Sequence, residues 1–297
     1  QIAQRATSAT ITAGSTIAAG YSTVDRFYVY CTGANVTAAQ VAGSGAIKNN
    51  LQITGAASVT AIGVGQRIEQ LNSYDMAGSN ATLSVNLSNS LLTTVTWTAY
   101  YATTADTFGT LASPTRTQIA TGTFTVTSTL TNYSTQISIP AAATTGIEVV
   151  FTVGAQTSGT WVIGNVQLEE SSVATSFDYR PYGTELALCQ RYFVGTGFGN
   201  MGICTNTTTS WNMSHTFPVA MRASPTLISY SGTLGTTNAM TDAYVQDYIL
   251  TTAIGSIINA GTTGARTSGW TTNNAGAGGR IAMWNSTTAV IQFSAEL

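Results

Sequence analysis

The feature that most constrains the fold is an alternation of apolar and hydroxyl side chains that recurs along the chain. Helical periodicity is scarce, and Gly, Asn and Ser interrupt the strand-like runs about every ten residues. In an extended chain one face of a single run carries Val95, Trp97, Ala99 and Tyr101, and the other carries Thr94, Thr96, Thr98 and Tyr100. The sequence therefore predicts an all-β fold built from sandwiches.

The strand signals fall into two groups on either side of a junction near residue 180. Before it they are Phe27 to Cys31, Ala81 to Leu87, Thr93 to Tyr101, Thr121 to Thr127, Tyr133 to Ile139, Gly146 to Val153 and Thr160 to Leu168. After Gly195 they are Met213 to Val219, Thr226 to Tyr230, Ala253 to Ile258, Arg280 to Trp284 and Val290 to Ala295. A length of 297 residues suits two such domains.

The composition excludes several classes of protein. Charged residues make up 7% of the chain and apolar residues 43%, so the surface is covered by uncharged Thr, Ser, Asn and Gln, and the chain is predicted to fold. Ten basic residues are spread singly against twelve acidic ones. Nucleic-acid binding needs basic side chains gathered on one face, so no nucleic-acid partner is predicted.

Cysteine spacing and hydropathy exclude further classes of site and of protein. Cys31, Cys189 and Cys204 are an odd number without a CxxC motif, which predicts buried free thiols and no zinc site. No apolar run is long enough to insert into a membrane. The first residue is Gln1, so a processed product, or part of a longer protein with an upstream anchor, is expected.

The junction reads GNVQLEESSVATSFDYRPYGTELALCQRYFV from Gly164 to Val194. It resembles a junction in tail-fibre and other virion structural proteins of bacteriophages, where a sandwich ends in "QLE…AT.F..RP" and an "EL..CQRY" segment follows. The later "FPVAMRASPTLISYS" and "IQFSAEL" resemble the C-terminal module of the same proteins. This resemblance implies a protein of the virion.

The N-terminal half carries a second resemblance, through "STVDRFYVY", "GQRIEQL" and "AGSNATLSVNL". These resemble the jelly-roll modules of phage fibres, which are related in shape to carbohydrate-binding modules. That family opens its sandwich with "DRW", and Phe27 stands here in place of the Trp. The exchange is conservative if the position packs in the core, and it matters if the ring is a sugar platform.

The resemblance implies a domain plan and an assembly. Residues 1–20 are expected to form an N-terminal arm or connection, 21–181 a jelly roll, 182–196 a helical connector, and 197–297 a smaller β-sandwich that serves as a recognition or interaction module. Tyr182 to Tyr192 is predicted to be helical, with one apolar side. A homotrimer and contacts with other virion proteins are implied by the likeness to fibres.

Catalytic patterns are few. Gly197, Gly199 and Gly202 match GxGxxG, but the following residues are β-branched and disfavour the helix that a dinucleotide site requires. His215 is the only histidine, and a structural or surface position is predicted for it in preference to a catalytic role. Asp242 with Asp247, and Glu169 with Glu170, are weak candidates for a hydrolytic pair, and an ion pair of Glu185 with Arg191 is expected to be a surface brace.

Sugar binding without catalysis needs aromatic faces beside amide, hydroxyl or carboxylate partners. The C-terminal half offers these groups in polar, Gly-rich or loop-like sequence, at Trp211, Trp270, Asn273, Asn274, Tyr244, Tyr248 and Asp242. The alternative is that such rings fill the core, which is expected for Trp97, Trp161, Trp284 and Tyr230. No DxDxDG calcium loop occurs, and no cofactor or metal is predicted.

The sequence thus favours a non-enzymatic bacteriophage tail fibre or receptor-binding protein that attaches the particle to host-surface glycans. A capsid decoration or head-fibre protein is the first alternative, because the same jelly rolls can lie on the head. A glycan depolymerase tailspike is the second, although no solenoid period is visible.

Overall fold

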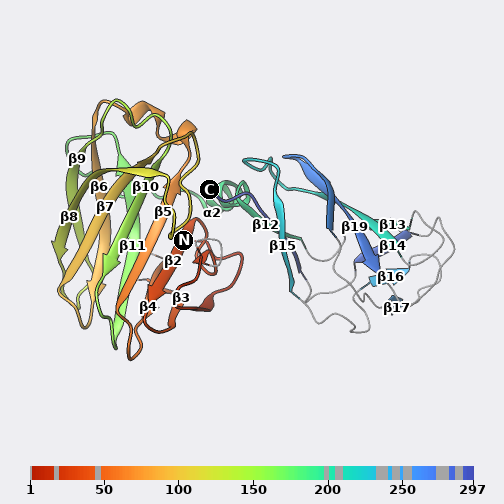
Figure 1. Ribbon diagram of the computed structural model, residues 1–297, viewed down its shortest axis with the longest axis horizontal. Helices are drawn as coiled ribbons and strands as arrows, with labels where there is room; N and C mark the ends of the chain where they lie inside the picture. Colours follow the sequence, from red (N-terminus) through yellow and green to blue (C-terminus); the bar gives the residue numbers. More distant parts are fainter. Residues whose placement is uncertain are drawn as a thin grey trace. The chain divides into compact units, whose positions relative to one another are not determined.

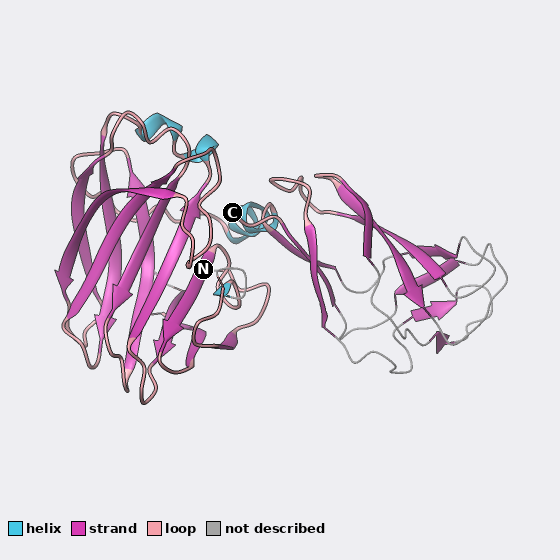
Figure 2. Cartoon of the chain, in the orientation of Figure 1, coloured by secondary structure: helices cyan, strands magenta, loops and turns pink. Residues whose placement is uncertain are grey.

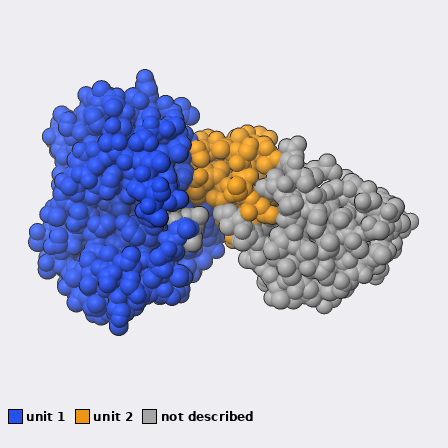
Figure 3. Space-filling view, viewed as in Figure 1, with its two compact units in different colours: residues 1–180, 297 blue, residues 181–296 orange. Residues whose placement is uncertain are grey.

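The computed structural model describes residues 2–16, 20–43, 48–196, 201–204, 210–231, 240–242, 248–249, 256–271, 281–284 and 290–297. The chain forms two compact units, residues 1–180 with 297, and residues 181–296 (Figure 3). Both units consist of antiparallel β-sheets, so the predicted all-β class with one short helical connector is confirmed (Figures 1 and 2).

The N-terminal unit is a jelly-roll sandwich of two sheets. The six-stranded sheet has the order β1 (Ser8–Ile11), β3 (Val36–Ala42), β4 (Asn49–Thr54), β11 (Thr160–Glu169), β6 (Asn80–Asn89) and β9 (Thr131–Ser138). The five-stranded sheet has the order β2 (Phe27–Thr32), β5 (Ala61–Ile68), β10 (Ile147–Val153), β7 (Thr94–Ala102) and β8 (Arg116–Thr125). Figure 2 shows the short 3-10 helices η1 (Gln70–Asn72) and η2 (Tyr74–Met76) at one end of the sandwich.

The predicted alternation forms the core between these sheets. Val95, Trp97 and Ala99 are buried in β7, whereas Thr96 and Thr98 are partly exposed on its other face. Trp161 is fully buried, so the core role predicted for Trp97 and Trp161 is confirmed. Phe27 is buried in the same core, which supports the packing interpretation of the residue that replaces Trp.

Sequence reasoning did not predict β1, β3 and β4. Their sequences, SATI, VTAAQVA and NNLQIT, are rich in Ala, Asn and Gln, which are not strand formers. Of the three, β4 pairs directly with the predicted strand β11, and β3 and β1 then pair one after the other onto β4. Residues 1–20, expected to form an arm, thereby contribute β1 to the six-stranded sheet.

The conspicuous QLE run of the junction has a structural explanation. After β11 the chain turns back, and Gln167 accepts a hydrogen bond from the main-chain N–H of Asp178 at 2.9 Å. Glu169 accepts one from the main-chain N–H of Thr175 at 2.8 Å and another from its hydroxyl at 2.7 Å. These bonds lower the pKa of Glu169. The side chains of β11 therefore hold the returning segment.

The C-terminal unit contains a helix and two sheets. Helix α2 (Tyr182–Gln190) leads into a three-stranded sheet of β12 (Phe193–Thr196), β21 (Val290–Ser294) and β15 (Thr226–Ser231). The seven-stranded sheet has the order β17 (Tyr248–Ile249), β16 (Met240–Asp242), β20 (Ile281–Trp284), β13 (Met201–Cys204), β14 (Ser210–Thr216), β19 (Gly264–Thr271) and β18 (Ser256–Ala260).

The helix forms where it was predicted, but its apolar side does not. Cys189 is its one buried residue, and Leu188 is 39% exposed. The neighbouring buried rings, Tyr192 and Phe193, lie beyond the helix end. Cys31 and Cys189 are buried free thiols, as predicted, and the side chain of Cys204 lies outside the described residues. In the described part of the chain no helix has the length and hydropathy to span a membrane.

His215 has a structural position, one of the two predicted for it, in the core of the C-terminal unit. It is 2% exposed, and its ring lies 5.0 Å from that of Phe293, centroid to centroid. The ring of Phe217 also packs against Phe293, with centroids 5.2 Å apart. Burial lowers the pKa of His215 from 6.5 to about 4.

This depressed pKa predicts acid sensitivity of the C-terminal unit. The folded state keeps His215 neutral, so its stability is complete above pH 6.5 and falls as the pH drops toward 4, by about 3 kcal/mol in total. Calorimetric unfolding at pH 7.5 and 4.5 measures this loss. A His215→Phe variant keeps the aromatic contact and should show a smaller loss; an equal loss in both proteins contradicts the assignment.

Candidate functional site

The outer face of the five-stranded sheet combines aromatic, hydroxyl and charged side chains. Directly paired residues of antiparallel strands share a face, and the pairings run across the whole sheet. One row is Tyr28, Gly65, Val150, Thr98 and Thr121, and the next is Tyr30, Gly63, Thr152, Thr96 and Thr123. A third row holds Arg67, Glu148, Tyr100 and Gln118.

Two tyrosines of β2 lie across two glycines of β5. A Cβ atom at Gly65 would overlap the ring of Tyr28, and one at Gly63 would overlap the ring of Tyr30. The two rings are nearly parallel, with an interplanar angle of 22° and centroids 6.3 Å apart. The glycines thus provide the space in which both rings rest on the sheet.

The two rings differ in accessibility. Tyr28 is fully buried, and Tyr21 packs edge-on against it at 5.7 Å. Tyr30 and Tyr100 are partly exposed and pack against the cluster formed by Tyr21, Tyr28 and Val150. Tyr28 is therefore the buried member of the cluster that supports its neighbours. Tyr30 and Tyr100 are the rings that remain partly accessible to solvent.

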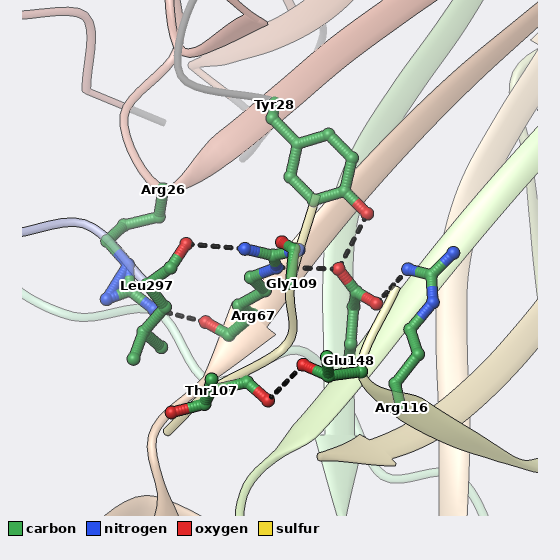
Figure 4. A network of polar contacts seen from close by, with 9 residues as sticks. Arg26, Tyr28, Arg67, Thr107, Gly109, Arg116, Glu148 and Leu297 are labelled. Atoms are coloured by element: carbon green, nitrogen blue, oxygen red, sulfur yellow. Dashed lines mark hydrogen bonds and ion pairs between the residues drawn. The ribbon is translucent and has the colours of Figure 1, made fainter. Parts of the chain in front are cut away.

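A buried carboxylate lies on the central strand β10, near one end of the face (Figure 4). Glu148 is completely buried and accepts hydrogen bonds from the Tyr28 hydroxyl at 2.8 Å and from Nε of Arg67 at 2.7 Å. Its second oxygen accepts from Nη1 of Arg116. A buried charge is tolerated when it is paired and hydrogen-bonded in this way.

The arginines also fix the surrounding backbone. Arg67 donates to the main-chain oxygens of Gly109 at 2.9 Å and of Leu297 at 2.7 Å, and its guanidinium lies 5.1 Å from the centroid of the Phe108 ring. Arg67 thereby anchors the loop between β7 and β8. The guanidinium of Arg116 lies over the ring of Tyr100, 4.1 Å from its centroid.

The electrostatics keep both phenols neutral. Burial, followed by the charge of Glu148, raises the pKa of Tyr28 well above 10, so this hydroxyl remains a donor. Burial also raises the pKa of Tyr30, against a lowering effect of Arg116. Burial alone would lower the pKa of Arg116, but attraction to Glu148 outweighs it and raises the pKa.

Beyond the tyrosines, the face is an array of hydroxyl groups. Thr96, Thr98 and Thr152 are partly exposed, and Thr121 and Thr123 are exposed. The hydroxyls of Thr98 and Thr121 lie 3.0 Å apart, and Thr121 also donates to the carbonyl of Trp97 at 2.9 Å. These internal bonds orient the hydroxyls and leave lone pairs for a ligand.

Four of the predicted sugar-binding residues, Trp211, Trp270, Asp242 and Tyr248, lie in strands of the seven-stranded sheet. Trp211 in β14 is paired in register with Trp270 in β19, so Trp270 lies in a strand and the predicted loop context is wrong. Its Gly and Thr neighbours suggested a loop, but pairing on both sides of β19 makes it a strand.

The remaining members of that set are less closely grouped. Asp242 in β16 and Tyr248 in β17 lie in neighbouring strands, which β20 and β13 separate from β14. Asn273, Asn274 and Tyr244 lie outside the described residues, as do the side chains of Trp211, Trp270, Asp242 and Tyr248. The recognition site in the C-terminal unit stays a prediction.

The structure also locates parts of the other predicted motifs, namely the GxGxxG sequence and the carboxylate pairs. β13, a strand, begins at Met201 and contains Gly202, so no helix starts directly after GxGxxG. Within the described ranges, no three His, Cys, Asp or Glu side chains gather in a way that could hold a metal ion. Glu169 binds Thr175 in the junction, and Asp247 lies among the residues that are not described.

Sequence reasoning missed the tyrosine face. A signal was present, because Tyr-x-Tyr in FYVYC and Gly-x-Gly in GVGQR both have the strand period. Glycines at alternate positions of a strand indicate close approach of another group. The sequence does not show that β2 pairs with β5, and this register is what makes the two motifs meet.

No protein-family profile and no curated protein matches the chain. Solved structures similar to it include a family 4 carbohydrate-binding module, with a TM-score of 0.38 and 14% identity over 54% of this chain and 97% of the module. The family 11 module of a cellulosomal cellulase of Clostridium thermocellum gives 0.34 and 12% over 51% and 92%. The enzymatically active domain of tailspike protein 4 of bacteriophage CBA120 gives 0.34 and 18% over 48% of this chain and 19% of that chain.

The chain therefore matches about a fifth of that tailspike chain and nearly all of each module. At these identities the likeness is one of fold alone. The fold and the face together define an all-β protein with a jelly-roll sandwich whose five-stranded sheet has an aromatic and hydroxyl-rich outer face.

The glycines under the tyrosines give a matched pair of variants. Gly65→Ala pushes against the buried Tyr28 ring, so we expect a loss of about 1–3 kcal/mol in the free energy of unfolding. Gly63→Ala pushes against Tyr30, which is partly exposed and loses less buried packing when it is displaced, so the loss should be smaller. Urea unfolding of both variants tests the order, and the reverse order would show that Tyr30 is the more rigid ring.

The buried carboxylate gives a second comparison. Glu148→Ala leaves Arg67 and Arg116 without their counter-charge and should lower the free energy of unfolding by about 3 kcal/mol or more. Tyr28→Phe removes a single hydrogen bond and should lower it by about 1 kcal/mol. Equal, small effects in urea unfolding would mean that Glu148 does not organise the face.

Proposed function

We propose that this chain is a non-enzymatic structural protein of a bacteriophage particle, part of a tail fibre, that attaches the particle to glycans on the host surface. The observation that carries the proposal is the partly exposed pair of Tyr30 and Tyr100 beside the threonine rows of the five-stranded sheet. The N-terminal unit is then a binding module as well as a scaffold.

The face has the chemistry that sugar recognition requires. A pyranose ring presents apolar C–H groups that pack on an aromatic ring, and hydroxyls that exchange hydrogen bonds with polar side chains. Tyr30 rests on Gly63 and next to Tyr28, so its ring is held in place before a ligand arrives. Preorganisation of this kind reduces the entropy lost on binding.

The carboxylate of this face supports binding rather than hydrolysis. Glycoside hydrolysis uses two carboxyl groups about 5–9.5 Å apart, of which one must exchange a proton with the substrate. Glu148 is fully buried and accepts hydrogen bonds from Tyr28, Arg67 and Arg116. A carboxylate held by three donors inside the protein is not available for that step.

The fibre assignment is supported by the resemblance of the junction and by the weakly charged, hydroxyl-rich composition. A fibre of linked copies, a homotrimer in this proposal, multiplies weak sites through effective concentration. A shallow face on each copy is then sufficient for attachment.

A capsid decoration protein is the second candidate, and one observation favours it. Leu71 and Tyr74 are 83% and 56% exposed at the end of the sandwich that carries η1 and η2 (Figure 2). Exposed apolar side chains of this kind suit contact with a neighbouring virion protein. Immunogold labelling of intact particles separates the candidates, with gold at the tail for a fibre and over the head for a decoration protein.

The binding face predicts a specific variant. On a panel of host-surface polysaccharides, Tyr30→Ala should weaken binding about tenfold or more, because an aromatic contact is lost. Tyr179→Ala is the matched control, since Tyr179 is 53% exposed and lies in the junction, outside this face. Trp270→Ala tests the alternative site in the C-terminal unit, and loss of binding in that variant alone would move the site there.

A further inference from the structure

Arg116, the first residue of the edge strand β8, has N–H groups that no acceptor in the described part of the chain uses. Among the described residues, the guanidinium donates one hydrogen bond, from Nη1 to Glu148. Nε and Nη2 have no acceptor among the described residues, and neither atom is buried without a partner, so both reach solvent. The side-on edge of the guanidinium, with its two parallel N–H groups, therefore points to solvent.

This edge is held in a fixed orientation. The guanidinium is held at one end by the ion pair with Glu148 and lies over the ring of Tyr100, 4.1 Å from the ring centroid. Its side chain is 13% exposed. An arginine that is already ordered loses little further entropy on binding, and a planar fork of two N–H groups matches a carboxylate.

The charge around the edge favours an anion. Arg67 and Arg116 place two guanidinium groups against the single carboxylate of Glu148. The donors of Arg67 are directed to Glu148 and to main-chain oxygens of Gly109 and Leu297, so Arg116 is the one of these two guanidinium groups that keeps donors for a ligand. The adjacent rows of the sheet are uncharged threonines.

The edge also lies within the aromatic surface. Arg116 stacks on Tyr100, and its charge acts on the hydroxyl of Tyr30. A sugar that packs on the ring of Tyr30 therefore brings its substituents toward the guanidinium.

We propose that Arg116 makes this face select acidic glycans, namely those whose sugars carry a carboxylate such as a uronic acid. The inference rests on the proposed glycan-binding function and names its substrate class. Tyr30 provides the packing surface, Tyr100 supports the guanidinium of Arg116, and Nε and Nη2 of Arg116 bind the carboxylate side-on.

The test uses a panel of bacterial surface polysaccharides, each printed in its native form and after chemical reduction of its carboxyl groups to alcohols. We expect the full chain to bind uronate-containing polysaccharides and to lose about tenfold or more in affinity when the same polymers are reduced. Binding should also weaken between 50 and 500 mM salt, because the contact is ionic. These measurements on the unaltered protein do not depend on how a variant folds.

Variants then assign the effect to the residue. Arg116→Gln should lose the preference for the native over the reduced polymer, and Arg180→Gln should keep it. Arg180 is 51% exposed and pairs with Asp178 in the junction, so this control removes the same charge outside the face. Arg116→Lys keeps the charge without the planar fork and should bind weakly, and thermal unfolding checks that each variant is folded.

The outcomes separate the two proposals. Equal binding of native and reduced polymers, or an unchanged preference in folded Arg116→Gln, overturns the selection of acidic glycans and leaves glycan binding intact. Binding that survives carboxyl reduction and follows phosphate groups assigns the edge to another anion and also overturns the carboxylate. Failure to bind every polymer of the panel overturns the proposed function, and the selectivity with it.

Discussion

The outer face of the five-stranded sheet depends on one interaction, the burial of Glu148 among three donors. The donors come from β2, β5 and β8, and Glu148 itself lies on β10, so a single carboxylate ties together four strands. A carboxylate without these partners would be unstable at this depth, and the arginines would lack a counter-charge. The positions of Tyr28, Arg67 and Arg116 follow from satisfying it.

The buried contacts of Glu148 also position the accessible side chains of the face. Tyr28 is held by Glu148 and lies on Gly65, and it forms the floor beside which Tyr30 rests on Gly63. Arg116 is held by the same carboxylate and covers Tyr100. A rigid buried half therefore positions a partly exposed half, which is the arrangement that a shallow binding surface needs.

The sequence predicts the fold better than the site. Alternation in β7 indicates the all-β class and the core positions of Val95 and Trp97, because burial on one face of a strand imposes a period of two. The Glu148 network cannot be predicted in this way, since Tyr28 lies 120 residues from Glu148 and Arg67 lies 81 residues from it. Such contacts depend on strand order and register, which local patterns do not encode.

The most direct test of the account is the NMR spectrum of the protein with ¹³C-labelled tyrosine rings, titrated with a polysaccharide that it binds. The account predicts that the ring signals of Tyr30 and Tyr100 shift, and that those of Tyr133 in β9 and Tyr179 in the junction do not. Shifts confined to Tyr244 and Tyr248, with Tyr30 and Tyr100 unchanged, would contradict it and place recognition in the C-terminal unit.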